Sequence, residues 1–383
     1  MLFATPELTD EEIGVVERID ELRRNLRYQV SGHPRRWTGS LRRAMFARAL
    51  RGSNSIEGYN VDMADAMALA EGDEPLDAVE ETRKAISGYR VAMTYVLQLA
   101  DDPHFELSDG LVRSLHFMML KYDMTKSPGL WRPGVIYVQH EPTGEIVYEG
   151  PPSTDVPVFM AELTDALGQP DDVPALVRAA MAHLNLVMIH PFRDGNGRMA
   201  RILQSLVLAR EGILAPEFAS IEEYLGRRTQ EYYDVLAEVG GRHWQPRRDA
   251  RPWVRFCLTA HFRQARTLSR RVGQSERLWT ILQNEVGRIG LSERTVLALF
   301  DAAQRFRVRN STYQAHTDLS EYAGGRDLKR LVDAGLLEPM GEKRGRYYVA
   351  TDRLLELAKP AWEAGRKWEL EDPFAPQQQT LTL

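Results

Sequence analysis

Cysteine is almost absent from this sequence. Cys257 is the only cysteine among 383 residues, so no disulfide can form within the chain. It lies in the apolar segment Trp253–Phe262, and we interpret it as a buried structural thiol rather than a nucleophile. A fold that depends on internal disulfides is therefore excluded.

Long apolar segments and a strong excess of one charge are also missing. No stretch approaches the roughly 20 apolar residues that a membrane-spanning helix needs. The segment Met1–Glu12 is acidic and has no basic start followed by an apolar run. We therefore expect a cytoplasmic protein with no membrane partner. The net charge of −5 does not by itself demand a nucleic-acid partner.

The residues that are abundant describe an ordinary soluble globular protein. Hydrophobic residues make up 43% and charged residues 27%, and the length suits two or three domains. Helical periodicity dominates, and Thr9 followed by Glu12 predicts a capping box at the start of a helix that reaches Leu26. Further helices are predicted at residues 41–53, 62–69, 76–99, 109–120, 157–167, 174–189, 199–210, 224–239 and 253–271.

One central segment is rich in β-favouring residues instead. Two runs, Val135–Gln139 and Glu145–Tyr148, flank the turn residues Pro142-Thr143-Gly144. This arrangement predicts a β-hairpin.

The C-terminal part of the chain has a pattern of its own. Helices are predicted at residues 293–303 and 311–317, and a third ends at Gly335. Two short strands, Leu336–Pro339 and Arg346–Ala350, follow around the basic turn Gly341–Gly345. Three helices and a hairpin are the order of a winged helix, so we predict a winged-helix-like α+β unit. The polar, proline-containing tail is expected to be disordered.

The loop after the apolar helix 174–189 carries the clearest chemical signal. In the segment HPFRDGNGRMAR, Gly195 and Gly197 allow positive φ, and a second helix begins directly afterwards. Backbone N–H groups curled at a helix N-terminus form an anion-binding nest. Arg198 and Arg201 lie three residues apart, so both side chains can face that nest.

Three more side chains in the loop fit a reaction at phosphate. Asn196 adds an amide donor. The carboxylate of Asp194 makes sense inside an anion site if Mg²⁺ or Mn²⁺ bridges it to phosphate oxygens. His190 lies at the rim, where it can accept a proton from an incoming hydroxyl. The loop therefore suits transfer between a nucleoside triphosphate and a hydroxyl.

These residues resemble the motif of the Fic family, which reads HxF, one variable residue, Asp or Glu, then GNGRxxR. Every fixed position is matched, and the wider resemblance extends loosely from about residue 50 to 260. The matched residues are His190, Phe192, Asp194, Gly195, Asn196, Gly197, Arg198 and Arg201. The resemblance implies a protein adenylyltransferase, which moves AMP from ATP to a Ser, Thr or Tyr hydroxyl of a target protein.

The resemblance also implies a role for each residue of the motif. His190 is similar to the general base, Asp194 to the ligand of Mg²⁺ or Mn²⁺, and Phe192 to the apolar anchor of the loop. The segment Gly195–Gly197 resembles the nest for the α- and β-phosphates. Arg198 and Arg201 resemble the phosphate clamps, with Arg201 toward the γ-phosphate.

Two segments outside the motif extend the resemblance to substrate binding. The hairpin Val135–Tyr148 resembles the family's flap, whose strand edge pairs with the backbone of a target protein. Tyr232 and Tyr233 resemble residues that line the adenosine. The family often has an asparagine about two turns later, where this chain has Gly240-Gly241.

The segment Ser53–Gly58 resembles the family's inhibitory motif, which is Ser or Thr, three residues, Glu, then Gly or Asn. Ser53, Glu57 and Gly58 match it, in the class whose inhibitory helix lies N-terminal to the core. We expect Glu57 to accept a bidentate pair from Arg201 and so keep that arginine from the γ-phosphate.

Other reactions on the same scaffold stay open. They are transfer of UMP, phosphocholine or phosphate, and removal of AMP with Glu57 positioning a water. The intact sequence Asp194–Arg198 argues against the phosphate-transferring relatives, whose loop departs from this pattern.

Two hypotheses concern partners other than the target protein, namely a homodimer and DNA bound by the C-terminal unit. The candidate DNA contacts are basic and are diluted by nearby acidic residues. They are Arg326, Lys329, Arg330, Lys343, Arg344 and Arg346.

The predicted fold is mainly α, a Fic helical core with a β-hairpin flap and a C-terminal winged-helix-like α+β unit. Residues 1–105 form the N-terminal helical region with the inhibitory motif, and 106–271 the catalytic core. Residues 272–358 form the winged-helix-like domain and 359–383 the disordered tail. Because the proposed chemical groups all precede the C-terminal unit, a chain ending near Arg271 is expected to keep the chemistry if it folds.

Overall fold

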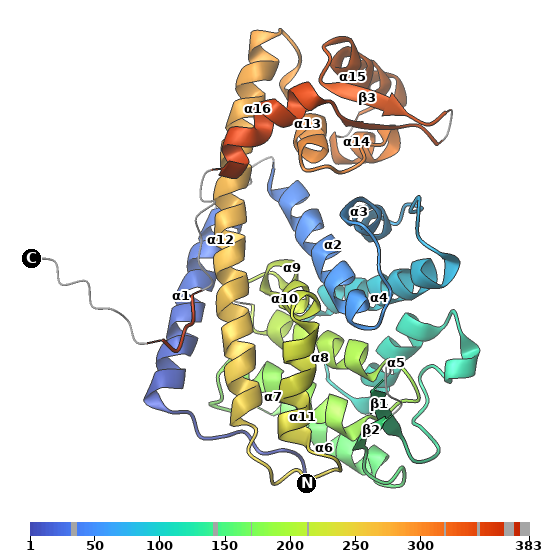
Figure 1. Cartoon of the computed structure of the whole chain (residues 1–383), viewed down its shortest axis with the longest axis vertical. Helices are drawn as coiled ribbons and strands as arrows, with labels where there is room; N and C mark the ends of the chain where they lie inside the picture. The colour runs from blue at the N-terminus through green and yellow to red at the C-terminus, as the bar shows by residue number, and fades with distance from the viewer. Residues whose placement is uncertain are drawn as a thin grey trace, which may run out of the picture.

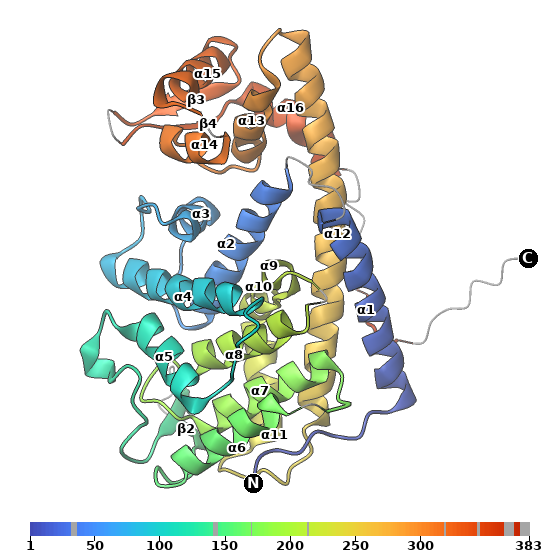
Figure 2. The same ribbon diagram turned by 180° about the vertical axis from the view of Figure 1, so that it is seen from behind.

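The computed structural model describes residues 1–31, 37–140, 145–169, 171–212, 214–317, 319–342, 345–363 and 371–375. Figure 1 shows an elongated, mainly helical molecule, and Figure 2 shows it from behind. One long helix, α12 (Arg251–Arg288), runs along most of the long axis. The predicted mainly α class is therefore confirmed. The hairpin turn residues Pro142–Gly144 and the basic residues Lys343 and Arg344 lie outside the described residues.

The remaining elements follow in chain order. The helices are α1 (Asp10–Ser31), α2 (Thr38–Ile56), α3 (Met63–Glu71), α4 (Glu80–Leu99), α5 (Asp109–Leu120), α6 (Val156–Gly168), α7 (Ala175–Ile189), α8 (Asn196–Arg210), α9 (Pro216–Ala219), α10 (Glu222–Arg227), α11 (Thr229–Gly240), α13 (Val296–Ala303), α14 (Asn310–Thr317), α15 (Glu321–Asp333) and α16 (Asp352–Glu363). Short 3-10 helices lie at η1 (Met124–Lys126) and η2 (Glu293–Thr295). Two antiparallel hairpins pair β1 (Tyr137–His140) with β2 (Glu145–Glu149), and β3 (Leu337–Met340) with β4 (Tyr347–Ala350).

The capping box predicted at the start of α1 is present. The Thr9 N–H donates to Glu12 Oε2 at 2.9 Å, and the Glu12 N–H donates to Thr9 Oγ1 at 3.3 Å. The buried Glu12 carboxylate also accepts from Arg251 at 2.7 Å. One local signal therefore both starts α1 and ties it to α12.

The hydrophobic core of the larger part of the molecule is continuous. It extends from Phe3 to Phe262 and includes most of the apolar side chains of α7 and α8. The N-terminal helices contribute to it, so residues before and after position 105 share one core. Among the described residues, no helix has both the length and the apolar character needed to cross a bilayer.

The helix predicted at residues 253–271 is longer than expected, because α12 continues to Arg288. Buried Leu268, Val272, Leu278 and Leu282 prolong its apolar stripe beyond the predicted end. Position 271, the predicted division between two domains, thus lies inside a helix. The second half of α12 forms another hydrophobic cluster with α13 to α16 and with the start of α2.

The C-terminal part has the predicted element order of three helices and a hairpin. The strands pair in register from Leu337 opposite Ala350, and an isolated bridge joins Val308 to Tyr348. The winged-helix assignment itself, like DNA binding and a homodimer, stays a prediction.

The expected disorder of residues 359–383 is wrong in part. Helix α16 continues to Glu363, and residues 371–375 lie against α1 and α12. Arg18 pairs with Glu371 at 3.0 Å, and the Arg255 guanidinium lies 3.8 Å from the centroid of the Phe374 ring. Residues 371–375 take a defined position because side chains of α1 and α12 bind them. The polar sequence of the tail does not predict these contacts. The other tail residues lie outside the described residues.

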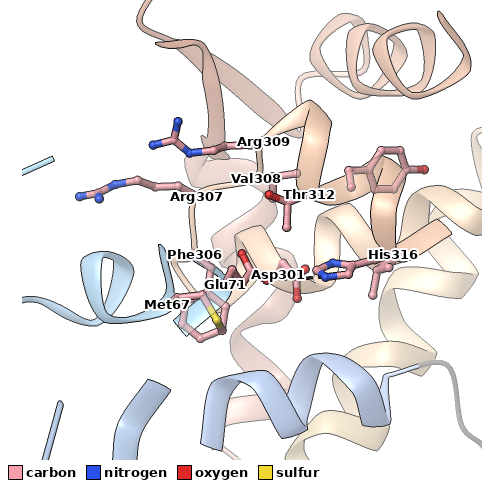
Figure 3. Close-up of a pocket in the computed structure, with 11 residues that line it drawn as sticks. Met67, Glu71, Asp301, Phe306, Arg307, Val308, Arg309, Thr312 and His316 are labelled. Carbon is pink, nitrogen blue, oxygen red and sulfur yellow. Dashed lines mark ion pairs between the residues drawn. The ribbon is translucent and has the colours of Figure 1, made fainter. Parts of the chain in front are cut away.

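The C-terminal part also packs on the N-terminal half of α2 and on α3 (Figure 3). Phe306 is 2% exposed and packs among alanines of α2 and α3. Arg43 on α2 bridges Asp301 at 3.3 Å and Glu71 at 3.0 Å. Burial raises the pKa of Glu71 to about 7, while Arg43 acts in the opposite direction. Helix α2 therefore touches the C-terminal part at one end and reaches the candidate site at the other.

Candidate active site

The loop from His190 to Gly195 turns sharply between α7 and α8. His190 has φ of +52° and Gly195 has φ of +78°. A Cβ at position 195 would lie 2.8 Å from the Met119 methyl group, so glycine is required there for conformation and for space. The expected curl before the N-terminus of α8 is present.

The Asn196 side chain closes this loop. Its Oδ1 accepts from the Phe192 N–H at 2.9 Å, and its Nδ2 donates to the Phe192 carbonyl at 2.9 Å. The amide therefore satisfies the loop's own backbone with one of its two N–H donors, and its role as a donor for an anion stays a prediction. The backbone N–H groups at the start of α8 are the other candidate donors.

The predicted apolar anchor, Phe192, is fully buried. Its ring stacks on His116, with centroids 3.7 Å apart and planes 6° apart, and lies 5.0 Å from the Trp131 ring. His116 Nδ1 accepts from the Gly129 N–H, so its Nε2–H donates to the Asp194 carbonyl at 2.9 Å. Burial lowers the pKa of His116 to about 4, which keeps it neutral. Sequence reasoning missed His116 because it lies about 80 residues before the loop.

His190 is positioned as a neutral proton acceptor. Its Nδ1 lies 3.1 Å from the Val187 carbonyl, a contact that requires hydrogen on Nδ1 and leaves the Nε2 lone pair as the acceptor. Burial lowers the pKa of His190 to about 4. Arg132, another residue that the sequence did not single out, donates from Nε to the His190 carbonyl at 2.8 Å.

Asp194 is held by a lysine that the motif does not contain. Lys126 Nζ lies 2.8 Å from Asp194 Oδ2, and Arg198 lies 3.9 Å from Oδ1. Burial alone would raise the pKa of Asp194, but Lys126 and Arg198 outweigh burial and lower it. A single charged carboxylate beside a phosphate nest is a donor that Mg²⁺ commonly shares with phosphate oxygens, so the residues present fit a divalent cation.

Arg198 and Arg201 are almost completely buried, and each is 1% exposed. Arg198 Nε and NH1 and Arg201 NH1 have no hydrogen-bond partner among the described residues. The Arg198 guanidinium also lies 5.2 Å from the Tyr59 ring centroid. Buried donors without partners are rare because they are unfavourable, and here they lie beside a nest. This arrangement can bind an anion with several oxygens.

The predicted contact between Glu57 and Arg201 is present, with one difference. Arg201 NH2 donates to Glu57 Oε1 at 2.7 Å, so the contact uses one oxygen and is not the expected bidentate pair. Ser53 accepts the other hydrogen bonds that the Arg201 guanidinium makes. Its Oγ accepts from Arg201 Nε at 2.7 Å, and its carbonyl accepts from NH2 at 3.0 Å. Gly58 has φ of +82°, which lets the chain leave α2 at this point.

The Glu57 carboxylate lies directly over the nest. A Cβ on Gly197 would be 2.7 Å from Glu57 Oε1. The protein's own carboxylate therefore lies beside the Gly197 backbone, in the predicted nest, while it is bound to Arg201.

The two tyrosines of α11 lie in different surroundings. Tyr232 is 1% exposed, and its hydroxyl lies 3.0 Å from His183 Nε2. Tyr233 is 44% exposed, and its hydroxyl donates to the Ile56 carbonyl at 3.4 Å, next to Glu57. Tyr232 thus has the environment of a core aromatic, whereas Tyr233 is at the surface beside the end of α2.

The predicted hairpin stands next to the loop. Val138 pairs with Tyr148, and the Tyr148 hydroxyl donates to the Met188 carbonyl at 2.7 Å. Arg132, before β1, donates to the Pro151 carbonyl after β2 and to the His190 carbonyl. One arginine therefore joins the base of the hairpin to the loop.

Comparison with known proteins agrees with this geometry. Residues 106–208 match the model of the Fic/DOC family. A protein adenylyltransferase fic-1 of Caenorhabditis briggsae is 29% identical over 211 residues, which cover 53% of this chain and 37% of that protein. A protein adenylyltransferase Fic of Nematostella vectensis is 25% identical over 258 residues, which cover 66% of this chain and 55% of that protein. The chain thus spans between about a third and just over half of these relatives.

Solved structures share the fold. A Fic family protein from Desulfovibrio desulfuricans superimposes with a TM-score of 0.58 at 23% identity, covering 91% of this chain and 98% of that one. Fic-1 from Caenorhabditis elegans gives a TM-score of 0.52 at 22% identity, with 67% and 72% covered. The family match contains the whole loop His190–Arg201, so residues 106–208 of this chain are similar to the Fic/DOC family.

Proposed function

We propose that this protein transfers AMP from ATP to a hydroxyl side chain of a target protein, and that Glu57 restrains the reaction. The observation that carries the proposal is the Glu57 carboxylate, which lies over the Gly197 nest and is bound to Arg201 at 2.7 Å. An intramolecular anion in that place indicates that the site is built for an external one. The similar proteins named protein adenylyltransferases support the identity of the group transferred.

In the proposed reaction the target oxygen attacks the α-phosphorus of ATP. A new P–O bond forms, the bond between the α-phosphorus and the bridging oxygen breaks, and pyrophosphate leaves. His190 Nε2 takes the proton of the attacking hydroxyl, and the nest with Arg198 stabilises the phosphate charge. A divalent cation held by Asp194 would neutralise part of that charge. Positioning and charge neutralisation account for most of the rate in phosphate chemistry of this kind.

The restraint follows from a choice between two partners. Arg201 NH2 can bind the Glu57 carboxylate or the γ-phosphate, but not both in one geometry. Glu57 has a high effective concentration because it belongs to the same chain. Charge-assisted hydrogen bonds contribute roughly 1.5–3 kcal/mol each, and shifting a two-state balance from 1:99 to 99:1 takes about 5.5 kcal/mol. The single Glu57 hydrogen bond can therefore supply roughly a quarter to a half of such a shift.

The hairpin is the proposed docking edge for the target. An extended segment that pairs with an exposed strand is registered by backbone hydrogen bonds, with little dependence on its sequence. Tyr148 and Arg132 hold the hairpin beside His190, so a paired segment would present its hydroxyl near the base.

The test compares labelling by three full-length proteins incubated with ATP labelled at the α-phosphate, Mg²⁺ and cell lysate. The native chain should label proteins weakly, and Glu57→Gly should label them much more strongly because Arg201 is released. Glu57→Gly combined with His190→Ala should show no labelling while still binding ATP.

Equal and strong labelling by the native chain and Glu57→Gly would contradict the restraint. Full labelling by the variant without His190 would contradict the assignment of the base. Loss of transfer in Glu57→Gly would favour the alternative in which Glu57 positions a water for removal of AMP.

A further inference from the structure

A buried carboxylate that belongs to neither motif lies behind Arg201. Glu222 is the first residue of α10 and is 2% exposed. Its Oε1 accepts from the Tyr89 hydroxyl at 2.7 Å, whereas its Oε2 has no hydrogen-bond partner among the described residues. Tyr89, on α4, is fully buried as well. The proposed reaction as described above uses neither side chain.

A row of polar side chains, Ser53 and Tyr89, lies between Arg201 and Glu222. Arg201 Nε–H donates to Ser53 Oγ at 2.7 Å. Because this oxygen already accepts from arginine, its own proton can be directed toward Tyr89. Burial raises the pKa of Tyr89, and Ser53 is among the groups that lower it. The Tyr89 hydroxyl donates to Glu222. Polar groups aligned in this way polarise one another, and this row ends on a carboxylate.

Close backbone packing fixes the position of Ser53 on α2 relative to Glu222 on α10. Gly52 on α2 is packed so closely on α10 that a Cβ would collide with the Glu222 carbonyl oxygen and lie 2.7 Å from the Glu223 Cα. A Cβ on Gly226 would likewise lie 2.7 Å from the Gly52 Cα. Ser53 follows Gly52 directly, so α2 presents its hydroxyl at a position that α10 determines.

The electrostatics explain why a second carboxylate is useful there. A buried guanidinium is stable only with a compensating charge. Glu57 provides that charge while the site is restrained, but in the proposed active state it has withdrawn. Burial raises the pKa of Glu222 to about 7, while Tyr89, Arg201 and Ser205 lower it.

We propose that Glu222, acting through Tyr89 and Ser53, is a positioning residue that keeps the Arg201 guanidinium in place for the γ-phosphate after Glu57 has withdrawn. The proposal rests on the proposed function, which makes Arg201 the clamp of the γ-phosphate. Arg201 Nε then stays on Ser53, and the clamp uses NH1, which has no partner among the described residues, together with the NH2 edge that Glu57 leaves.

The experiment measures the affinities of ATP and ADP, each with Mg²⁺, for full-length Glu57→Gly by isothermal titration calorimetry. This protein should prefer ATP, and further change of Arg201→Ala should abolish the preference. Adding Glu222→Gln or Tyr89→Phe should lower the ratio of ATP to ADP affinity by about tenfold, the size of one charge-assisted hydrogen bond. The affinity for ADP, which lacks the γ-phosphate, should change little.

Two matched variants test for a merely structural effect. Ser205→Ala removes a hydroxyl 3.4 Å from the same carboxylate but outside the row to Arg201. Glu223→Gln alters the neighbouring buried carboxylate, whose partner is Arg271 at 2.6 Å. Both variants should keep the ATP preference of Glu57→Gly, although Glu223→Gln should lower the melting temperature.

An unchanged ratio in Tyr89→Phe, or in a folded Glu222→Gln, would overturn the proposal, and so would an equal loss of preference in Glu223→Gln. Tyr89→Phe decides the question if Glu222→Gln does not fold. If Glu57→Gly itself shows no preference for ATP, the role of Arg201 in the proposed function fails, and the role of Glu222 fails with it. A retained preference that Glu222→Gln leaves unchanged overturns the Glu222 proposal alone.

Discussion

Two groups on which the proposed reaction depends already have partners within the chain. Lys126 lies 2.8 Å from Asp194, and Glu57 lies 2.7 Å from Arg201. Each contact pairs a charge of the site with an opposite charge from the same chain. The proposed substrates must therefore replace an internal ion pair at both places, and the balance at each place depends on single residues.

The first prediction at the residue scale concerns pH. Burial lowers the pKa of His190 to about 4, so lowering the pH protonates its imidazole only near pH 4, not near the ordinary value of about 6.5. The single-turnover rate of Glu57→Gly at saturating ATP and Mg²⁺ should therefore not halve near pH 6.5 through this group. A direct check follows the ring carbons of His190 by NMR between pH 8 and 5, with His190→Ala for assignment. A titration centred near pH 6.5 would contradict the prediction.

The second residue-scale prediction concerns the cation. If Asp194 holds Mg²⁺ or Mn²⁺ beside the phosphates, Asp194→Asn in Glu57→Gly should remove nearly all transfer. Addition of EDTA should do the same to Glu57→Gly, and excess Mg²⁺ should restore it. Asp171→Asn changes an exposed acidic residue on the way into α7 and serves as the control. Undiminished transfer in EDTA would rule out the metal role.

At the scale of elements, α2 carries Ser53, leads into the proposed restraining residue Glu57, and packs closely on α10. Gly52→Ala should force the two backbones apart and lower the free energy of unfolding by about 1–3 kcal/mol. Because Glu57, just after the end of α2, moves with position 52, its contact with Arg201 should weaken, and transfer by the otherwise native chain should rise. Thermal melting and labelling with α-labelled ATP measure the two effects.

The matched control is Gly39→Ala on the same helix. A Cβ there meets only the Arg43 side chain, at the ordinary distance of 3.6 Å. Alanine is a better helix former than glycine by roughly 0.5–1 kcal/mol, so this variant should be slightly stabilised and remain restrained. Equal effects of the two substitutions would show that the contact with α10 has no special role.

At the scale of the whole molecule, α12 joins the two hydrophobic clusters. A chain that ends at Arg271 would lose the second half of α12 and all of α13 to α16. Leu41 and Met45 of α2, and Phe218 of α9, belong to the hydrophobic cluster that these elements complete, so part of that cluster would become exposed. We therefore predict that this shortened chain melts well below the full-length protein or aggregates, although its chemical groups are all present. Differential scanning fluorimetry checks this, and equal melting temperatures would contradict it.

Much of the candidate site follows from local sequence, because its requirements are local. Gly195 must adopt positive φ, Asn196 closes a loop with a residue four positions away, and Thr9 with Glu12 starts a helix. Such signals depend on residues within one turn of each other. The motif, the hairpin and the capping box were therefore predictable from the sequence.

Only the tertiary structure decided which distant side chains complete the site. Lys126, Arg132 and His116 come from segments far upstream of the loop, and nothing in their own surroundings marks them. The continuation of α12 beyond Arg271 depends on α13 to α16, because these helices cover its apolar stripe there.

The contact between Glu57 and Arg201 shows the same division between sequence and tertiary structure. The resemblance of two sequence segments to the family's motifs pointed to both partners, and their opposite charges make the contact favourable. Arg201 binds one Glu57 oxygen and not two because its Nε–H already donates to Ser53 Oγ. The row of polar side chains from Arg201 to Glu222 depends on four helices, α2, α4, α8 and α10, that meet only after folding. The chemical identity of the groups is thus a property of the sequence, whereas their partners and geometry are properties of the packed core.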